Sequence, residues 1–287
     1  MKVDDYRKEY EARLKSGAQA PRTSGSRFST SALGGGQPAF EHVIEQDQAE
    51  VLERHIAQVR DDTQPEEARR KSLRAVRAAT FLGASFDRHR PNYRQALRDV
   101  ATREGDPLRV SALQVLAMEK DDVARDLLTK GLDDPGQAIV PPAKAIQLLG
   151  YDDHGVAVPY ARRLLEAGLG DEVKVEALRV LASDPGSDEL LAKFLSDTSE
   201  AAEVRSISAV ALKQVNPLRF TEEARKIVVS DEEPESVRAS CLGGLAQLRG
   251  SGILPTDRTF VDEVIKLQSF GPSEELRASA SRYLEGQ

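Results

Sequence analysis

Four histidines and one cysteine are the side chains of this 287-residue chain best suited to metal binding or nucleophilic chemistry. The histidines are scattered and have no ligand-like spacing to one another or to Cys241. A single cysteine also excludes an intramolecular disulfide and a cysteine-based metal site. The sequence therefore predicts no metal site, and it predicts that Cys241 is a packed thiol.

The neighbouring carboxylates and the glycines of the chain do not form a catalytic or phosphate-binding motif either. The pairs Asp133-Asp134 and Glu232-Glu233 fall in turns, where acidic residues cap helices. No glycine-rich loop offers a lysine and a hydroxyl at the spacing of a phosphate-binding loop. We predict neither catalytic residues nor a cofactor.

Arginine is the one residue type suited to ligand binding that recurs in a regular pattern. Two stripes recur at helical spacing, each on one face of a helix. The segment from Ala68 to Arg109 holds eleven Lys or Arg and four Asp or Glu, a net +7 that leaves −14 for the rest. Guanidinium stripes bind phosphates or carboxylates, but they also pair with acidic neighbouring units and solvate a surface. The stripes are Arg70, Arg74 and Arg77, and Arg90, Arg94 and Arg98.

Composition narrows the class of protein. The net charge of −7 argues against non-specific coating of nucleic acid by the whole chain. No apolar run approaches the roughly 20 residues that span a bilayer. The charged stretch from Met1 to Tyr10 lacks the apolar core of a secretory signal. We therefore expect a cytoplasmic protein without a membrane segment.

The N-terminal region differs from the rest in composition. Tyr6 to Leu14 predicts a short helix with a thin apolar stripe, and Ser16 to Pro38 is rich in Gly, Ser and Thr. Such a segment buries too little apolar surface to offset its ordering entropy. We predict a short helix and a flexible tether over residues 1–40, which either caps the array or docks on a partner, and a folded array over residues 41–287.

Self-similarity is the main feature of that array. A nine-residue window recurs with an apolar residue or Ala first, a small residue fifth and an aliphatic residue ninth. Its starts lie 40, 32, 33, 31, 33 and 39 residues apart. The windows are Ala68–Val76, Leu108–Leu116, Val140–Leu148, Val173–Leu181, Val204–Leu212, Val237–Leu245 and Leu276–Leu284.

The window has a physical reason. Positions one, five and nine share one helical face, and a small middle residue lets two helices approach closely. The unit at Val140 departs, because it has Lys144 fifth and Pro141-Pro142 in its first turn. We expect that helix to be rotated, so that Ala143 or Ala145 takes the tight place.

A basic residue follows the first window position in six of seven units, and an amphipathic helix precedes each window. Two helices of about twelve residues with their turns give a unit near 33 residues. The basic residues are Arg69, Arg109, Lys174, Arg205, Arg238 and Arg277.

This pattern of an acidic turn, Pro, Val-Arg and then Ala and Leu at helical spacing resembles the HEAT repeat, most closely the bacterial variety found in bilin lyases. The resemblance covers Asp47 to Glu285 and predicts an all-α, right-handed α-solenoid of about seven helix pairs. It implies that the Val-Arg helices line the concave surface. It also implies a ladder between each arginine and the turn acid of a neighbour, interrupted at Pro141.

The leading functional hypothesis is a non-enzymatic scaffold that binds another protein or peptide on its concave face, in an unspecified oligomeric state. Repeat type is strong evidence for fold and almost none for function. The partner-binding candidates are Arg70, Lys71, Arg74, Arg77, Gln114, Arg179 and Arg282.

Two alternatives stay open. The first is nucleic-acid or polyanion binding through Arg90, Arg94 and Arg98. HEAT-like DNA glycosylases share the architecture, but their base pocket depends on tryptophans and this chain has none. The second is help in attaching a chromophore, as the bilin-lyase resemblance implies.

Overall fold

The structure is a computed structural model that describes residues 38–151, 155–250, 252 and 257–285. Contacts divide the chain into two units, Met1–Gln48 and Ala49–Gln287. The predicted N-terminal helix and the tether up to residue 37 lie outside the described residues. The helical repeats belong to the second unit.

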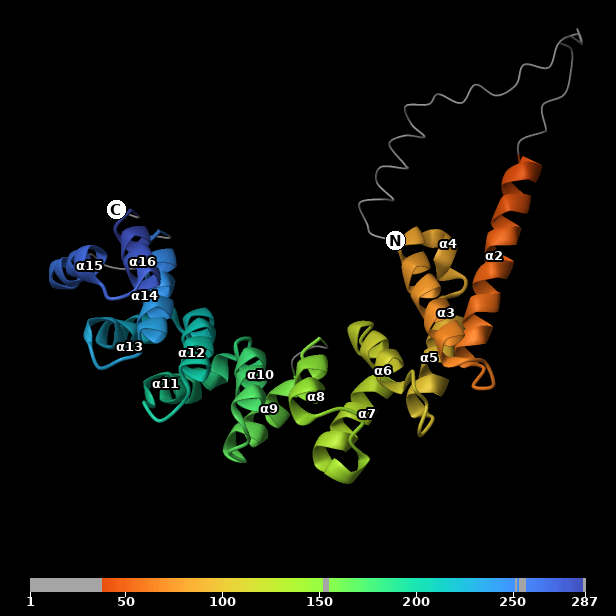
Figure 1. Ribbon diagram of the computed structural model, residues 1–287, viewed down its shortest axis with the longest axis horizontal. Helices are drawn as coiled ribbons and strands as arrows, with labels where there is room; N and C mark the ends of the chain where they lie inside the picture. The colour runs from red at the N-terminus through yellow and green to blue at the C-terminus, as the bar shows by residue number, and fades with distance from the viewer. Residues whose placement is uncertain (1–37, 152–154, 251, 253–256, 286–287) are drawn as a thin grey trace, which may run out of the picture. The chain divides into compact units, whose positions relative to one another are not determined.

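Helix follows helix along the described residues, which contain no strand (Figure 1). We call the first helix of each pair the A helix and the second the B helix. The A helices are α2 (Pro38–Arg60), α5 (Arg90–Thr102), α7 (Asp122–Asp133), α9 (Ala157–Glu166), α11 (Asp188–Ser196), α13 (Pro217–Val229) and α15 (Arg258–Phe270). The B helices are α3 (Glu66–Ala79), α6 (Arg109–Met118), α8 (Pro142–Leu149), α10 (Asp171–Leu181), α12 (Ala202–Val215), α14 (Glu235–Gly250) and α16 (Glu274–Glu285). The short α4 (Ala84–Asp87) lies between α3 and α5.

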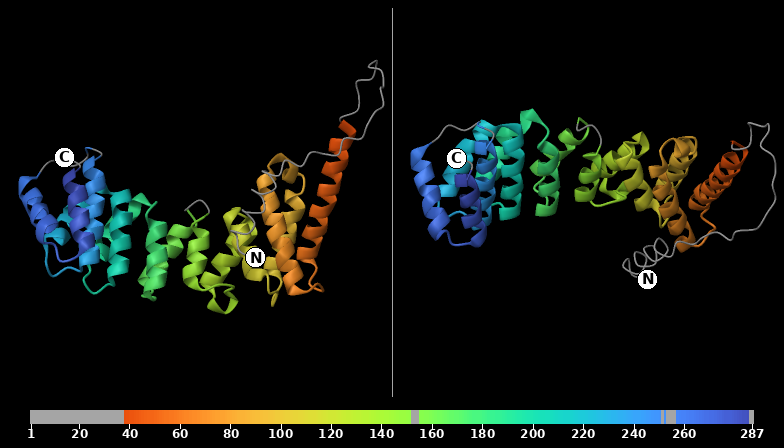
Figure 2. Two further views of the ribbon diagram at one scale, coloured as in Figure 1. Left: turned by 45° about the horizontal axis from the view of Figure 1, so that its top comes forward. Right: turned by 90° about the horizontal axis from the view of Figure 1, so that it is seen from above.

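The pairs stack in series within this unit. From α5 onward each A helix packs on its own B helix, and from α6 onward each B helix contacts the next B helix. The views in Figure 2 agree with this order. Every predicted window lies on a B helix or begins within two residues of its start. The predicted fold class, an α-solenoid of about seven HEAT-type helix pairs, is therefore confirmed.

The core is a continuous aliphatic seam along the B helices. In α12, Val204, Ser208 and Leu212 are the first, fifth and ninth window residues, and all three are buried. Cys241 holds the fifth position in α14 and is also buried, as predicted. Small middle residues allow this close packing because no side chain holds the helices apart.

Helix α8 buries both alanines that the sequence offers for the tight place. Ala143 and Ala145 are 4% and 3% exposed, so both flank the tight place. Lys144 is only partly buried, and its Nζ donates to Gln147 Oε1 at 2.7 Å. The ammonium group stays at the edge of the seam, because an unpaired buried charge is costly.

Two adjacent glycines in α14 have opposite surroundings. A Cβ on Gly244 would lie 2.6 Å from the Cζ atom of Phe220, a ring of α13 that is 1% exposed. A Cβ on Gly243 would meet nothing within 4 Å. Gly244 is therefore required by packing, whereas Gly243 leaves open space above the helix.

These surroundings predict opposite effects of one methyl group. Gly243→Ala should raise the free energy of unfolding by about 0.5–1 kcal/mol, because alanine loses less backbone entropy in a helix. Gly244→Ala should lower it by about 1–3 kcal/mol, because Phe220 must move. Guanidinium unfolding followed by circular dichroism measures both. Equal shifts of the same sign would contradict this packing.

Candidate functional site

Basic residues near the start of the B helices cap the C-terminal ends of the preceding A helices. The last carbonyls of a helix lack partners within the helix, and a cation there also favours the helix dipole. Four arginines donate from Nε to the carbonyl of the second-to-last residue of the A helix, at N–O distances of 2.9–3.1 Å. The pairs are Arg69 with Val59, Arg109 with Ala101, Arg205 with Leu195, and Arg238 with Val228.

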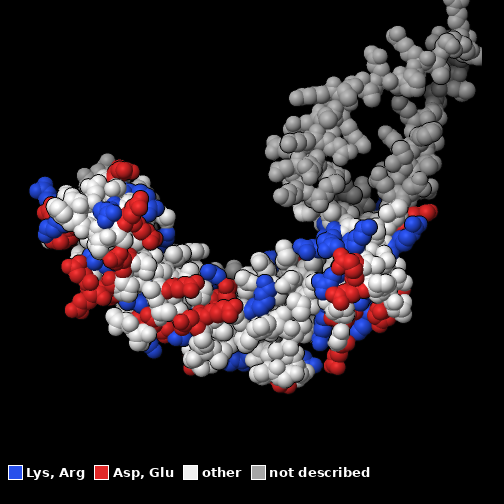
Figure 3. Space-filling view, viewed as in Figure 1, with Lys and Arg blue, Asp and Glu red and all other residues white. Residues whose placement is uncertain are grey.

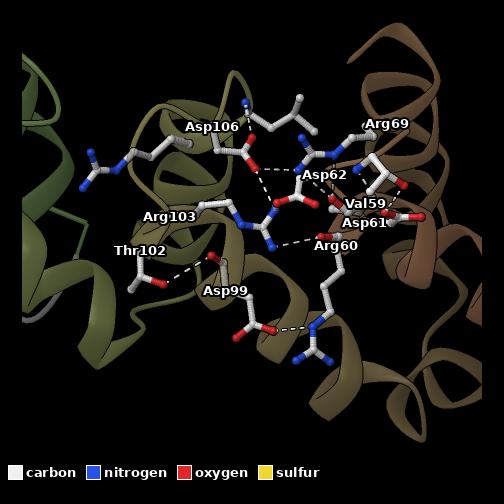
Figure 4. A network of polar contacts seen from close by, with 12 residues as sticks. Val59, Arg60, Asp61, Asp62, Arg69, Asp99, Thr102, Arg103 and Asp106 are labelled. Carbon is white, nitrogen blue, oxygen red and sulfur yellow. Dashed lines mark hydrogen bonds and ion pairs between the residues drawn. The ribbon is translucent and has the colours of Figure 1, made fainter. Parts of the chain in front are cut away.

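Three basic residues at this position reach an acid in the turn of the following repeat, whereas Arg238 pairs with Asp231 in the turn of its own repeat at 3.0 Å. Arg69 NH2 lies 2.7 Å from Asp106 Oδ2, and both side chains are buried. Asp106 also pairs with Arg103 and accepts from the backbone N–H of Leu108 (Figure 4). The remaining rungs are Arg205 with Glu233 and Lys174 with Glu200, both at 2.6 Å.

The three rungs match part of the ladder that the family resemblance implies, and Arg109, which precedes the Pro141 turn, forms no ion pair with an acid among the described residues. Pro141 precedes α8 and Pro142 begins it, whereas the turns before α6, α12 and α14 place an acid at this point. Asp134, further back, accepts hydrogen bonds from Gly136 and Gln137 within its own turn. Glu233, expected from sequence as a helix cap, instead pairs across repeats.

A second set of ion pairs links successive A helices and was not predicted from the sequence. An aspartate caps the N-terminal turn of one A helix or the 3-10 turn before it, and an arginine of the preceding A helix binds that aspartate. Asp121, for example, accepts from the N–H of Val123 and from Arg98 at 2.9 Å. The signal was the aspartate that recurs before these helices. The pairs are Arg98 with Asp121, Arg162 with Asp184, and Arg225 with Asp257.

The structure brings the three candidate polyanion-binding arginines together. Arg90, Arg94 and Arg98 line one groove of about 450 Å³ along α5. Arg98 and Arg94 both meet Asp121, at 2.9 and 3.6 Å, and Arg94 also meets Glu119. Arg90 pairs with Asp87 at 3.1 Å. Polyanion binding here stays a prediction, and an incoming phosphate would compete with these carboxylates.

The candidate partner-binding residues do not form one cluster. They lie on the B helices α3, α6, α10 and α16. On α3 they include Lys71 and Arg77, which are exposed, and two arginines paired within the helix. Gln114 is half-buried, Arg179 pairs with Glu176, and Arg282 donates to Ser279 Oγ at 2.9 Å. The pairs on α3 are Arg70 with Glu66 and Arg74 with Glu67, at 2.6 and 2.9 Å.

The ladder also shapes the surface charge. Lys174 and Arg205 are drawn inward, with side chains 17% and 1% exposed. Asp171, Glu172 and Glu203 near them remain exposed. Figure 3 accordingly shows Asp and Glu gathered over α10 and α12, and Lys and Arg near α3. Burying the bases thus leaves an acidic face in the middle of the unit.

This packing shifts the pKa values of the Asp106 carboxyl and of the Cys241 thiol. Burial raises the pKa of the Asp106 carboxyl, but hydrogen bonds from Arg69 and the Leu108 N–H outweigh it, so the pKa is lowered overall. Burial raises the pKa of the Cys241 thiol to about 12. A thiol with this pKa is a poor nucleophile near neutral pH, in accord with its packing role.

Neither a metal site nor a membrane segment is found in the described part of the chain. No three His, Cys, Asp or Glu side chains converge there as a metal-binding group. None of its helices combines the length and hydropathy needed to cross a bilayer.

The similarity of this chain to known proteins is weak. No protein-family model matches the chain, and no curated protein matches it at a significant level. Among solved structures, human deoxyhypusine hydroxylase in complex with glycerol is similar, with a TM-score of 0.34 and 17% identity over 87% of this chain and 98% of that chain. A likeness at this level carries no argument about activity. The architecture defines an all-helical repeat protein whose helix pairs stack in series.

Arg69 and Arg70 offer a matched comparison of buried and exposed arginines. Arg69→Ala should lower the free energy of unfolding by about 3 kcal/mol or more, because it leaves the buried Asp106 carboxylate short of a partner. Arg70→Ala removes an exposed pair and should cost less than about 1 kcal/mol. Urea unfolding of both variants measures the difference. Similar losses would show that the ladder contributes no more than a surface ion pair.

The lowered pKa of Asp106 predicts a loss of stability in acid. A carboxyl with a lower pKa in the folded state stabilises the protein above its unfolded pKa, about 3.9, and this contribution disappears as pH falls through the folded value. Wild-type stability should therefore fall from about pH 5 downward, and more steeply than that of Asp106→Asn. Urea unfolding at several pH values tests this. Parallel declines would rule out a role for Asp106.

Proposed function

We propose that this protein is a non-enzymatic cytoplasmic scaffold that binds another protein or peptide on the face of its B helices. One observation carries the proposal: the B helices α3, α6, α10, α12 and α16 present a row of exposed side chains, which is interrupted at α8, where Ile146 is buried. By the HEAT resemblance this row lies on the concave surface. A stack of repeats holds such a row at fixed spacing, which suits an extended partner.

The chemistry of the row supports protein recognition. Arg74 and Arg179 are exposed cations, while Val110, Met118 and Val210 are 41%, 58% and 53% exposed. Arginine and apolar side chains together are typical of protein interfaces. The basic region near α3 and the acidic face over α10 and α12 would orient a partner of complementary charge and speed its association.

Polyanion binding is the second candidate, because Arg90, Arg94 and Arg98 line one groove. The two functions differ in their response to salt. Affinity for nucleic acid falls steeply with salt concentration, since binding releases counterions. Binding of a protein to a mixed polar and apolar face depends on salt much less.

Charge reversal on the B face tests the scaffold. The double variant Arg74→Glu/Arg179→Glu should reduce capture of a native-host partner by about tenfold or more, since interface energy concentrates in few residues. The matched control, Lys193→Glu/Lys226→Glu, alters exposed lysines of the A helices α11 and α13. Quantitative mass spectrometry of the captured proteins is the measurement. Loss of the same partner with the control alone would refute a B-face site.

A fluorescence anisotropy titration separates the second candidate. Labelled single-stranded DNA and RNA are added to the full chain between about 50 and 300 mM salt. If the scaffold proposal holds, Arg90→Glu should not change the affinity for either nucleic acid. Binding that weakens steeply with salt and is lost in Arg90→Glu would establish the polyanion function instead.

A further inference from the structure

A groove crosses the C-terminal B helices α12, α14 and α16. Its volume is about 220 Å³. The floor is apolar and built from small side chains, and the rim is polar. Floor residues include Ala209, Val210, Ala239 and Gly243, and rim residues include Lys213, Gln247, Glu275 and Arg282.

The floor is open because of Gly243. Val210, Gly243 and Arg282 occupy the same window position on three successive B helices. A Cβ on Gly243 would meet nothing within 4 Å, so the middle of the row is a pit. Gly244 beside it lets the Phe220 ring close the space beneath α14. The pit therefore has a packed base and an open top, which suits an incoming apolar side chain.

Two cations on the rim are not paired with carboxylates. Lys213 contacts Gln247 Oε1, and Arg282 donates to the Ala278 carbonyl and to Ser279 Oγ. Among the described residues no Asp or Glu forms an ion pair with either of them, in contrast to the ladder cations. Their charges are available to an acidic group from outside.

The charge on the rim has a direction. Glu275 lies in the first turn of α16, whereas Lys213 and Gln247 lie in the last turns of their helices. Because the B helices stack side by side, the acidic group lies at one end of the groove and Lys213 at the other. A ligand carboxylate would be attracted toward Lys213 and Arg282 and repelled near Glu275.

We propose that this groove binds a linear peptide segment of a partner protein, with an apolar side chain above Gly243 and a neighbouring Asp or Glu on Lys213 and Arg282. The inference rests on the proposed scaffold function and names one of its contact sites. The small volume fits one large side chain, so specificity comes from the pairing of that side chain with one acidic neighbour. An apolar anchor in a pocket beside charged groups is typical of peptide recognition.

The test uses the full chain and a phage-displayed library of random linear peptides. Peptides enriched on the wild type should share a large apolar residue next to Asp or Glu. Fluorescence polarisation then compares four proteins: the wild type, Gly243→Ala, Gly243→Trp, and Lys213→Glu/Arg282→Glu. The last two should each weaken binding by about tenfold or more, and Gly243→Ala much less.

The variants control for one another. Gly243→Trp fills the pit and Gly243→Ala leaves most of it, so a loss in the first alone reports on space rather than on folding. The charge variant leaves the floor intact and tests the carboxylate separately. Thermal melts confirm that each variant is folded.

Two outcomes would overturn the groove. Enriched peptides that bind Gly243→Trp and the charge variant as tightly as the wild type would place their site elsewhere. Failure to enrich any such peptide would exclude a linear acidic-apolar ligand. Either result leaves the scaffold proposal to the capture experiment with Arg74→Glu/Arg179→Glu, so the two proposals fail separately.

Discussion

The interaction on which this structure depends is a buried guanidinium that serves two repeats. In the first pair Arg69 donates to the Val59 carbonyl at the end of α2 and to Asp106 in the next repeat. The first contact satisfies a carbonyl that the helix leaves unpaired. The second joins neighbouring repeats, which also meet through the aliphatic seam and through ion pairs such as Arg60 with Asp99. Arginine suits both tasks because its donors point in fixed, different directions.

Burying these bases has a consequence at the surface. Each rung removes a positive charge from solvent, whereas exposed acids such as Glu203 stay. The acidic face over α10 and α12 therefore results from how the repeats are joined. On α3 several cations lie outside the ladder, so the same architecture leaves that end basic (Figure 3). The distribution of charge on the surface therefore depends on which cations are buried in the ladder and which stay exposed.

The structure contains several departures from the repeat. Pro141 interrupts the ladder, and Lys144 of α8 stays at the edge of the seam. Gly243 leaves a pit where other repeats place a longer side chain. Lys213 and Arg282 keep their charges free of acidic partners in the described residues. Packing requires Gly244 but not the open space above Gly243 or the unpaired cations beside it, which is why we propose that they bind a ligand.

The helices, their pairing and the seam could be predicted from the sequence alone. Val204, Ser208 and Leu212 show why: their spacing repeats within one helix, and a local period can be read directly from a chain. The arginine at the second window position could be recognised for the same reason. Which charges are paired, by contrast, depends on how distant segments pack. Arg98 meets Asp121, 23 residues away, while Arg282 meets no carboxylate among the described residues, and nothing local distinguishes them. The contrast between Gly243 and Gly244 was equally hidden, because it depends on where Phe220 of another helix lies.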